Sequence, residues 1–569
     1  MAAIISEKFR IFNAKQFLES LSEANPTNMY FFVGRPTSWY SYVEISNPTG
    51  TWDTTNTIDG GPLDGASVVA IYDNSLLLST TASTAAPTAG STLTQAVSGA
   101  TAKIRSFRYA TEDAPPAPLD NQIEKSRIYD DIIAAKRIIS DQARHVAPRY
   151  NWSLTTNPKF DMYRPNYSAT PAGGGALGVQ TALGSSSLSG SKFYVMNSNY
   201  EVFKCIYNGT TPGNPTGTNV QFEPKKSPSA GEGAYSGGIY SEGVANGYVW
   251  KYMYTLSTGE VIAFLSSDFM PIGTYDGPAA VAGAVHVALD GGNSAALPAG
   301  TTFYVPIDGD GSGGKVKIVT TAGGAISTVE IEDAGSGYTY ANVRVVDGNT
   351  FQAADLAAAV GSWPAAATAH IVPIISPEGG HGADLPSEFF AKRIMTNIRL
   401  TYAEGSGDFP VDNDFRRIGI VQDPVDWGTS TKSTATTLRG TFAIKITNPS
   451  ADYVPDEVIT QAGTNAKGTV VSYDSTNKIV KYFQSPELHT HEGKVVAFSG
   501  TGNVTGATST ATGAVDDAQD TALADIAFTD GIATPEIKPD SGDIVYIENR
   551  RLITRAPDQI EDIKLVIEF

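Results

Sequence analysis

One short stretch carries carboxylates with the spacing of a calcium-binding loop. In the run DGDGSGG, Asp308 and Asp310 alternate with glycines, and hard cations prefer several carboxylate and carbonyl oxygens on such a tight turn. The position that should supply the closing bidentate carboxylate is occupied by Thr320. We therefore favour a hairpin or surface turn over a calcium site.

A second stretch, ELHTHEG, carries two imidazoles two residues apart. In an extended chain His489 and His491 lie on one side of a strand, where they could bind a transition metal together with Glu487 or Glu492. The stretch offers no convincing third ligand. We interpret it as an exposed polar strand.

No other pattern is typical of catalysis. The remaining histidines (His145, His286, His370 and His381) show no nucleophile or carboxylate spacing of a triad. Runs such as PAGGGALG lack the lysine and the strand-to-helix context of a phosphate loop. The 59 Asp and Glu residues form countless pairs, so their number does not indicate a glycoside hydrolase. We predict no enzyme, no cofactor and no metal site.

Composition and charge limit the class of protein. A chain of 569 residues is long enough for several domains. The net charge of −19, without a Lys/Arg cluster, argues against nucleic-acid binding, which needs many phosphate-neutralising cations. The single cysteine, Cys205, cannot form an internal disulfide; we expect a buried thiol, with an intermolecular bridge as the alternative.

The first 21 residues do not have the basic and apolar regions of a secretory signal. No apolar run approaches the roughly 20 residues of a membrane span. We therefore expect a protein that is made and stays in the cytoplasm, or that leaves by a route needing no signal, such as lysis, and that does not bind membranes.

Two helices are predicted. The first, in NAKQFLESLSEANP, should begin at Asn13 as N-cap and end before Pro26. The second covers 120–146, where Ile128, Ile132, Ala135 and Ile139 recur at helical spacing.

The rest of the chain is rich in Gly, Thr, Ser, Asn and Tyr, with short apolar runs between turn residues, which favours strands. Three strands are predicted at the C-terminal end, in IVYIE, LITRA and IKLVIEF. We expect the first to be central in its sheet, and the last to be half-buried, with Ile563, Leu565, Ile567 and Phe569 on one face.

Three stretches rich in Gly, Ala, Ser and Thr are interpreted as inserted β modules. LTQAVSGATAKIRSF at 93–107 and ITQAGTNAKGTVVSY at 459–473 are similar to each other without a gap, which indicates a duplicated element, with coincidence as the alternative. The predicted organisation has core segments separated by these modules. The core segments are 1–60, 113–282, 371–449 and 534–569, and the modules are 61–112, 283–370 and 450–533.

Aromatic blocks of the core segments carry a family resemblance. The four aromatic blocks are MYFFVGRPTSWY, VAPRYNW, NGYVWKYMYTL and the terminal SGDIVYIENR, and a further block, FRRIGIVQDPV, precedes the last of them. In this order they look like the baseplate wedge subunit of T-even-type contractile-tailed bacteriophages, the family of gene product eight. The resembling blocks cover roughly half the chain and are interrupted where the modules were placed independently.

The resemblance implies a fold and a function. The expected fold class is α+β and β-rich, with a β-sandwich core, a few flanking helices and small all-β inserted modules. The terminal strands would complete one core sheet with strands from the first 60 residues, 115–280 and 390–450. The expected protein is a structural subunit of the tail baseplate, a homodimer that assembles with other wedge proteins and has no catalytic residues.

Loop residues that combine arginine with aromatic rings are our candidates for the interface with partners: Arg35, Trp39, Tyr40 and Arg550. The alternative places the arginines in internal ion pairs and the rings in the core. Two other functions stay open from the sequence. One is a tail-associated receptor protein whose modules bind host carbohydrate, although Trp363 is the only tryptophan in them. The other is an enzyme that degrades envelope polysaccharide.

Overall fold

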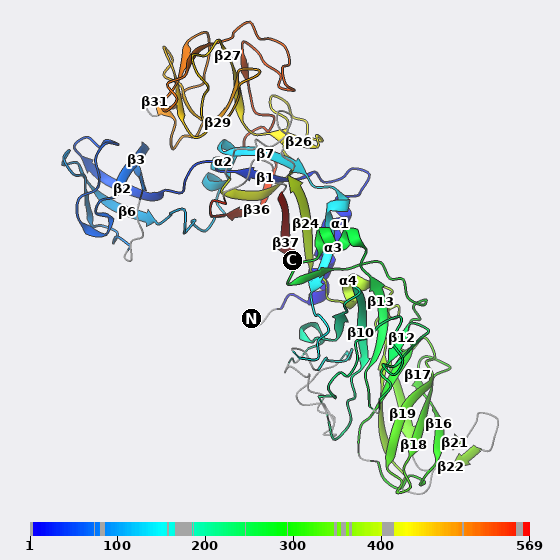
Figure 1. Cartoon of the computed structure of the whole chain (residues 1–569). Coiled ribbons are helices and arrows are strands. Elements are labelled where there is room, and N and C mark those ends of the chain that lie inside the picture. The colour runs from blue at the N-terminus through cyan, green and yellow to red at the C-terminus, as the bar shows by residue number, and fades with distance from the viewer. Residues whose placement is uncertain are drawn as a thin grey trace. The chain divides into compact units, whose positions relative to one another are not determined.

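The computed structural model describes residues 4–569 except 73, 80–85, 156–158, 166–184, 186, 215, 245, 293, 346–349, 354–359, 363–366, 401–414, 492–493 and 554–560. Thirty-seven strands and four α-helices are found in the described residues, which confirms the predicted β-rich α+β class (Figure 1). No helix in this part of the chain is long and apolar enough to cross a membrane.

The chain divides into two compact units rather than the single core that we inferred. Unit one comprises residues 1–18, 143–396 and 564–569, and unit two comprises 19–142 and 397–563. Each unit is built from segments far apart in the sequence, because the chain passes from one unit to the other four times.

The central sheet of unit two is antiparallel and takes its strands from five distant segments. In spatial order these are β26 (Thr437–Arg439), β7 (Ile132–Arg137), β1 (Met29–Gly34), β25 (Arg417–Gln422) and β36 (Asp543–Asn549). Strand β1 is apolar on both faces and wholly buried, as a middle strand should be. Strand β36 completes this sheet as expected, but at its edge. The prediction of a central strand was wrong, since Val545 is half exposed.

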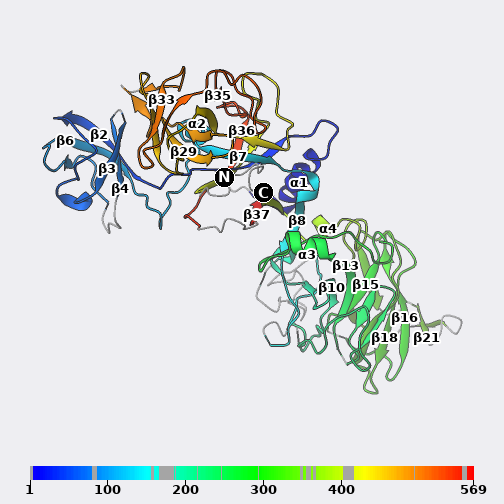
Figure 2. The ribbon, with the colours of Figure 1, turned by 45° about the horizontal axis from the view of Figure 1, so that its top comes forward.

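Helix α2 (Gln122–Asp130) covers one face of the central sheet and is shorter than predicted (Figures 1 and 2). The Asn121 side chain accepts a hydrogen bond from the Glu124 N–H and caps the helix. The predicted continuation to 146 was wrong. Residues 132–137 form β7, whose first four residues are buried between two neighbouring strands, so tertiary pairing overrides the helical spacing.

A four-stranded sheet contains the other C-terminal strand. Its order is β14 (Phe269–Pro271), β8 (Ala143–Pro148), β24 (Arg393–Leu400) and β37 (Glu561–Glu568). Ile563 and Leu565 are buried and their neighbours are more exposed, as the alternating pattern predicts, whereas Ile567 and Phe569 of the same predicted face are only half-buried. The predicted strand in LITRA is not found at Leu552 or Ile553, and the remainder of that stretch lies outside the described residues.

Two further α-helices are α1 (Glu7–Ser20) and α3 (Thr258–Phe264). Helix α1 begins six residues before the predicted Asn13 cap. The N–H of Phe9 bonds to the Ser6 hydroxyl, so Ser6 and not Asn13 satisfies the first turn.

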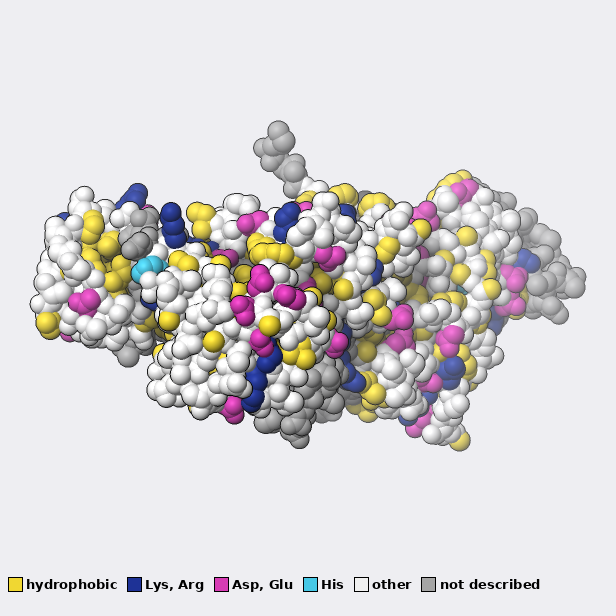
Figure 3. All heavy atoms as spheres, turned by 90° about the horizontal axis from the view of Figure 1, so that it is seen from above, with side chains coloured by type: hydrophobic (Ala, Val, Ile, Leu, Met, Phe, Trp, Pro, Cys, Tyr) yellow, Lys and Arg dark blue, Asp and Glu magenta, His cyan; other side chains and the backbone are white. Residues whose placement is uncertain are grey.

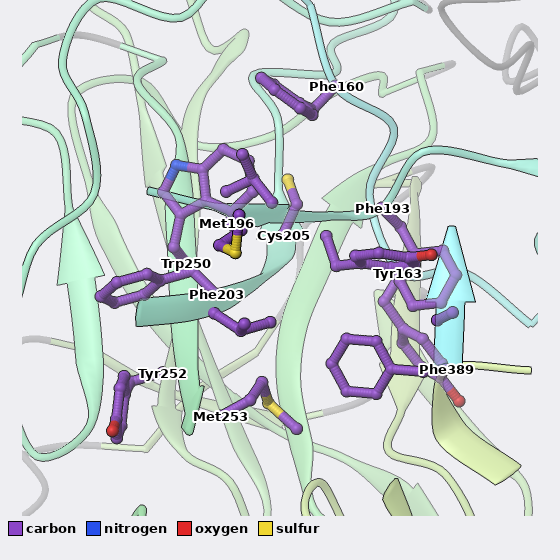
Figure 4. Packing of buried hydrophobic residues seen from close by; sticks show 14 of the residues in the cluster. Phe160, Tyr163, Phe193, Met196, Phe203, Cys205, Trp250, Tyr252, Met253 and Phe389 are labelled. Atoms are coloured by element: carbon purple, nitrogen blue, oxygen red, sulfur yellow. The ribbon is translucent and has the colours of Figure 1, made fainter. Parts of the chain in front are cut away.

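The core of unit one lies around the sheet β11 (Ala234–Ser236), β12 (Ile239–Ser241), β13 (Val249–Thr255), β10 (Glu201–Tyr207) and β9 (Tyr194–Met196). Figure 4 shows Trp250 and Cys205 within this packing. The Trp250 ring stacks on Tyr248 at 5.3 Å and meets the Phe160 ring edge-on at 5.4 Å. Cys205 is fully buried as predicted, and burial raises the pKa of its thiol.

Strands of the middle module form two sheets that share a core. One is β15 (Val285–Asp290), β23 (Ala369–Ile375), β20 (Ala341–Val345) and β17 (Asp308–Gly309). The other is β19 (Ile326–Asp333), β18 (Lys315–Thr320), β16 (Thr302–Pro306), β21 (Thr350–Ala353) and β22 (Val360–Ser362). Along β15, Val285 and Ala288 face this shared core, whereas Leu289 joins the Trp250 core. Strand β15 therefore packs against both cores.

The first module is a five-stranded sheet with its own apolar cluster. Its order is β3 (Ser67–Tyr72), β4 (Ser75–Ser79), β2 (Ser41–Thr49), β6 (Thr101–Arg108) and β5 (Thr92–Thr94). Strand β2 comes from the segment that we assigned to the core, so this sheet begins about twenty residues before the predicted boundary at 61.

The third module closes into a barrel, because β30 pairs with both β29 and β27. It contains β27 (Phe442–Thr447), β28 (Val458–Gln461), β29 (Lys467–Asp474), β30 (Ile479–Phe483), β33 (Asn503–Gly506), β34 (Thr512–Val515) and β35 (Ile532–Ala533). Strands β31 (Thr490–His491) and β32 (Lys494–Val495) form a separate ribbon. Strand β27 precedes the predicted boundary at 450.

The two similar sequences form the same hairpin. Gln95 and Gln461 are both buried, and each side-chain carbonyl accepts a hydrogen bond from the hydroxyl three residues later, at 2.9 Å from Ser98 and 2.8 Å from Thr464. The side-chain NH2 group of each glutamine donates hydrogen bonds to backbone carbonyls of a neighbouring loop. Gln95 contacts the carbonyl of Asp53 at 2.6 Å, and Gln461 contacts that of Ser499 at 2.9 Å. The similarity of the two sequences therefore corresponds to a hairpin with the same buried glutamine and the same hydrogen bonds.

A third copy of this hairpin, over 504–515, was missed. There Gly506 replaces the glutamine, and the Glu457 carboxylate lies where its side chain would be, since a Cβ on Gly506 would meet Glu457 Oε2 at 2.5 Å. The Glu457 carboxylate accepts the N–H and hydroxyl of Ser509. Because the buried acceptor comes from the residue before β28, no repeated glutamine reveals this copy in the sequence.

Candidate functional site

One of the four proposed interface residues, Arg35, belongs to a largely buried charge network of unit two, and a second, Trp39, packs against it. The network comprises Arg35, Arg127, Arg417, Glu124, Asp131 and Glu487. Trp39 is only 6% exposed, with the Arg35 guanidinium 4.7 Å and the Arg417 guanidinium 5.6 Å from its ring centroid. Such stacking adds cation–π attraction to the ion pairs. Arg35 and Trp39 therefore occupy the internal arrangement that we set beside the interface hypothesis.

Arginines at the centre of the network bridge acids from different elements. Arg417, on β25, contacts Glu124 of α2 at 3.0 Å and Asp131 at 3.3 Å. Arg35 lies 3.8 Å from Asp131 and 3.9 Å from Glu487. Burial lowers the pKa of Arg35, while the Asp131 and Glu487 charges oppose this change.

Glu487 connects the third module to the central sheet. It lies in the segment after β30, and its carboxylate contacts Arg127 of α2 at 2.9 Å as well as Arg35. Because Arg35 adopts a positive φ of 59° directly after β1, its side chain departs from the strand path toward these acids. The network thus fixes the module to the sheet by paired charges.

The other two proposed residues are at the edge of this network. Arg550 lies 3.5 Å from Glu548, and its backbone carbonyl accepts the Trp39 Nε1–H at 2.9 Å. Tyr40 is half-buried. Glu112 joins the same region, because it accepts the Trp39 backbone N–H and pairs with Arg416 at 2.9 Å.

Asp130 should make unit two pH-dependent. Burial, and then the negative charges of Asp131, Asp540 and Glu487, raise the pKa of Asp130 to about 7. An acid whose pKa is raised by folding binds its proton more tightly in the folded state, so stability is lost as pH rises from about 4 to about 7. We expect Asp130→Asn to be more stable than the wild type at pH 8 and equal to it near pH 4, measured by urea unfolding. A constant difference across this range would contradict the assignment.

A second group of titratable side chains, the Lys204 cluster, lies inside unit one and was not predicted. It comprises Lys204 of β10, Glu388 of α4 (Leu385–Glu388), His381, His286 of β15 and Lys251 of β13. Lys204 is fully buried. Its Nζ lies 2.5 Å from Glu388 Oε1 and 3.0 Å from His381 Nδ1, and it sits 3.6 Å from the Tyr163 ring centroid.

The Lys204 cluster is ionic at its centre and neutral at its histidines. Burial lowers the pKa of Lys204 to about 8, with Glu388 opposing the change. Burial alone would raise the pKa of Glu388, but the Lys204 charge and the contacts with His381 outweigh it and lower this pKa to about 2. The second carboxylate oxygen of Glu388 accepts the Gly382 N–H at 2.8 Å. At neutral pH the pair is therefore charged and hydrogen-bonded.

The two histidines of the cluster should make unit one acid-sensitive. Burial and the nearby lysine charges lower the pKa of His381 to about 3 and that of His286 to about 4. A base with a lowered folded pKa leaves more protons on the unfolded chain, so stability falls as pH drops below about 6.5, by up to about 1.4 kcal/mol per pH unit for each histidine. The slope of stability against pH is proportional to the number of protons taken up on unfolding. We expect His286→Gln to lower that number by about one between pH 6 and 4.5, as measured by calorimetric unfolding. An unchanged slope would refute this.

The stretches with possible metal ligands serve as structural contacts. The Asp310 carboxylate accepts the N–H groups of Thr339 and Tyr340 and the Thr339 hydroxyl, and these bonds lower its pKa to about 2. It therefore anchors a turn, as favoured from the sequence. Asp308 begins the short strand β17.

His489 is buried, and the interpretation of an exposed strand was wrong for this residue. Its Nδ1 accepts the Ser485 N–H at 2.8 Å, its Nε2 lies 2.8 Å from the Thr469 hydroxyl, and burial lowers its pKa to about 4. His491 is half-buried beside Asn465. Within the described residues no group of three or more His, Cys, Asp or Glu side chains could hold a metal ion; Glu492 and Trp363 lie outside them.

The missed sites had a weak signal in the sequence. Lys204 and Lys251 stand in the otherwise apolar strands EVFKCIY and VWKYMYT, where a lysine needs a buried partner. The partner, Glu388, is 184 residues away, and nothing local identifies it. Comparison with known proteins adds no assignment, because no family model and no curated protein matches this chain.

Proposed function

We propose that the chain is a structural virion protein, a baseplate wedge subunit of a contractile phage tail. In this proposal it is made in the cytoplasm of the bacterial host, forms a two-fold homodimer and assembles with other wedge proteins. It uses broad surfaces for binding and performs no catalysis.

One observation carries the proposal: each of the five blocks that resemble the wedge family contributes a strand to a sheet built from the predicted core segments, which we call the framework sheets. The blocks correspond to β1, β8, β13, β25 and β36. The segments between them form sheets with apolar clusters of their own, in the first, middle and third modules. A framework of this kind, with modules inserted between its strands, fits a protein that presents surfaces to several neighbours.

The titratable groups of the two clusters also support a role without chemistry. Lys204, Glu388 and His381 are each no more than 4% exposed, so a substrate does not reach them. Arg417 and Asp131 are similarly buried and paired. On the face seen in Figure 3, basic side chains are scattered among acidic ones, which does not favour a phosphate-binding surface.

Co-expression tests the proposal. A tagged copy of the chain, produced with the other candidate baseplate proteins of the same genome, should retain at least one of them in stoichiometric amount through affinity capture and gel filtration. Capsid proteins of that genome provide the matched control and should not be retained. Capture of none of the baseplate candidates would reject the wedge role and direct attention to glycan binding by the modules.

A further inference from the structure

Unit one contains a cavity of about 340 Å³ whose lining does not include the ionic groups of the Lys204 cluster. The lining comes from α1, the end of β8, the segment before β9, β9 itself and the segment between α4 and β24, all within unit one. Ser187 and Ser189 of this lining are exposed, so a ligand reaches the cavity from solvent. Pockets that bind small molecules measure about 300–1,000 Å³. The cavity therefore suits a ligand of about one ring.

A strained backbone holds an aromatic ring at this cavity. Phe390 follows the end of α4 with a positive φ of 52°, at a position that glycine normally occupies. A bulky side chain rarely adopts this conformation, and such strain is concentrated at sites that bind ligands. The Phe390 ring is half-buried and meets the Phe193 ring edge-on at 6.2 Å. The chain thus keeps an aromatic ring where its backbone favours glycine.

Hydrogen-bonding groups of both kinds surround the same cavity. Lys392 and Arg393 supply donors, and the Glu7 carboxylate supplies acceptors. The hydroxyls of Ser187 and Ser189, which lie 3.2 Å apart, can do both. A ligand whose own groups both donate and accept matches this mixture, and hydroxyl groups have that property.

Tyr150 adds a further hydroxyl to the lining. Its ring is held in place by the Tyr194 ring, 5.0 Å away, and by Lys192 Nζ, 5.2 Å from its centroid. Among the described residues the Tyr150 hydroxyl has no hydrogen-bond partner, so it is left for a ligand. Lys192 and Asp161, whose charge acts on Tyr150, add one charge of each sign beside it.

The charges at the cavity balance each other. Lys392 Nζ lies 3.3 Å from Glu7 and 3.2 Å from Glu568. The Arg393 guanidinium lies 2.8 Å from the same Glu568 carboxylate. A phosphate or carboxylate ligand is bound most strongly by cations that have no other partner. The two cations and two carboxylates here therefore favour a ligand without charge.

We propose that this cavity binds one neutral hexose unit of a glycan. A sugar ring has C–H groups on its faces, which Phe390 would contact, and hydroxyls around its edge, which Tyr150, the two serines and Glu7 with Lys392 would bind. The cavity is built from predicted core segments, so it differs from the glycan binding by modules that stayed open from the sequence. The inference does not depend on the wedge role.

Saturation-transfer NMR of the full-length chain with the methyl glycosides of glucose, galactose, mannose and N-acetylglucosamine tests the proposal. At least one should bind with a Kd in the millimolar range, and the affinity should be nearly the same at about 0.05 and 0.5 M salt, because no net charge is involved. The methyl glycoside of glucuronic acid should bind more weakly than that of glucose. Binding of none of the four neutral glycosides, or tighter binding of the acid, would overturn the proposal.

Two substitutions locate the binding in the cavity. Tyr150→Phe removes only the hydroxyl and should weaken binding about threefold to tenfold. Phe390→Gly removes the ring and should weaken it about tenfold, while the fold is kept because glycine suits the positive φ. Tyr340→Phe is the matched control, since Tyr340 is 64% exposed in the middle module, and it should bind as the wild type does. Circular dichroism checks the fold of each variant.

The outcomes separate this site from the wedge role. Wild-type affinity in both Tyr150→Phe and Phe390→Gly would show that the sugar binds elsewhere and would overturn the site. Capture of baseplate proteins by a chain that binds no hexoside would overturn the site and leave the wedge role intact. Binding that both substitutions weaken, in a chain that captures no baseplate protein, would support the site and reject the wedge role.

Discussion

Replacing Glu388 by alanine is expected to lower the free energy of unfolding of unit one by about 3–5 kcal/mol, because it leaves the ammonium group of Lys204 buried without its counter-charge. Lys204 is fully buried, and Glu388 supplies its nearest negative charge, at 2.5 Å. Chemical denaturation at pH 7, followed by tryptophan fluorescence, measures the loss. Trp250 reports on it directly, since it lies in the adjoining core.

Two comparisons separate this effect from a general loss of packing. The double variant Lys204→Met/Glu388→Leu removes both charges and should recover most of the lost stability, because a buried ion pair gains little over apolar side chains of similar size. Glu330→Ala breaks the exposed pair between Lys317 and Glu330 on β18 and β19, and should cost no more than about 1 kcal/mol. A Glu388→Ala variant as stable as Glu330→Ala would show that the cluster is not a charged pair.

Arg417→Met is expected to have an effect of similar size, about 3–5 kcal/mol at pH 8, in unit two. The substitution leaves Glu124 and Asp131 buried, with Arg108 at 3.4 Å and Arg35 at 3.8 Å as their remaining cations. Burial already raises the pKa of Asp131, and loss of Arg417 should raise it further. The loss should therefore shrink as the pH falls and the carboxyl groups take up protons.

Arg399→Met is the matched control for this prediction. Arg399 is about half exposed and pairs with Asp562 at 2.8 Å on the surface of the same unit, so its loss should cost about 1 kcal/mol or less and be independent of pH between 5 and 8. Hydrogen exchange of peptides from 442–533 should also rise in Arg417→Met if the network holds the third module. Equal effects of the two substitutions would contradict the role given to the network.

Patterns of neighbouring residues in the sequence correctly predicted those features of the fold that neighbouring residues determine. The alternation in IKLVIEF identified the buried Ile563 and Leu565, and the repeated Thr-Gln-Ala identified two copies of one hairpin. The helical spacing of Ile128 and Ile132 failed because Ile132 pairs in a sheet whose other strands are about a hundred or more residues away. Spacing alone does not distinguish a buried strand from a buried helix.

The charged sites depend on ion pairs between residues far apart in the chain, so the sequence alone could not predict them. Arg35 and Trp39 were noticed as an arginine beside an aromatic ring, but the acidic partners of Arg35, Asp131 and Glu487, come from remote elements. The division into two units has the same origin. Three of the four crossings between the units lie inside α1, β24 and β37, so no change of composition marks the boundary there.

The central claim, a structural subunit that acts by assembly, is tested most directly by the mass of the purified chain alone and after mixing with the other candidate wedge proteins of its genome. The 60.0 kDa chain should form a dimer of about 120 kDa and then shift completely into a larger complex of fixed stoichiometry. A monomer or trimer whose mass is unchanged by any of those proteins would contradict the account.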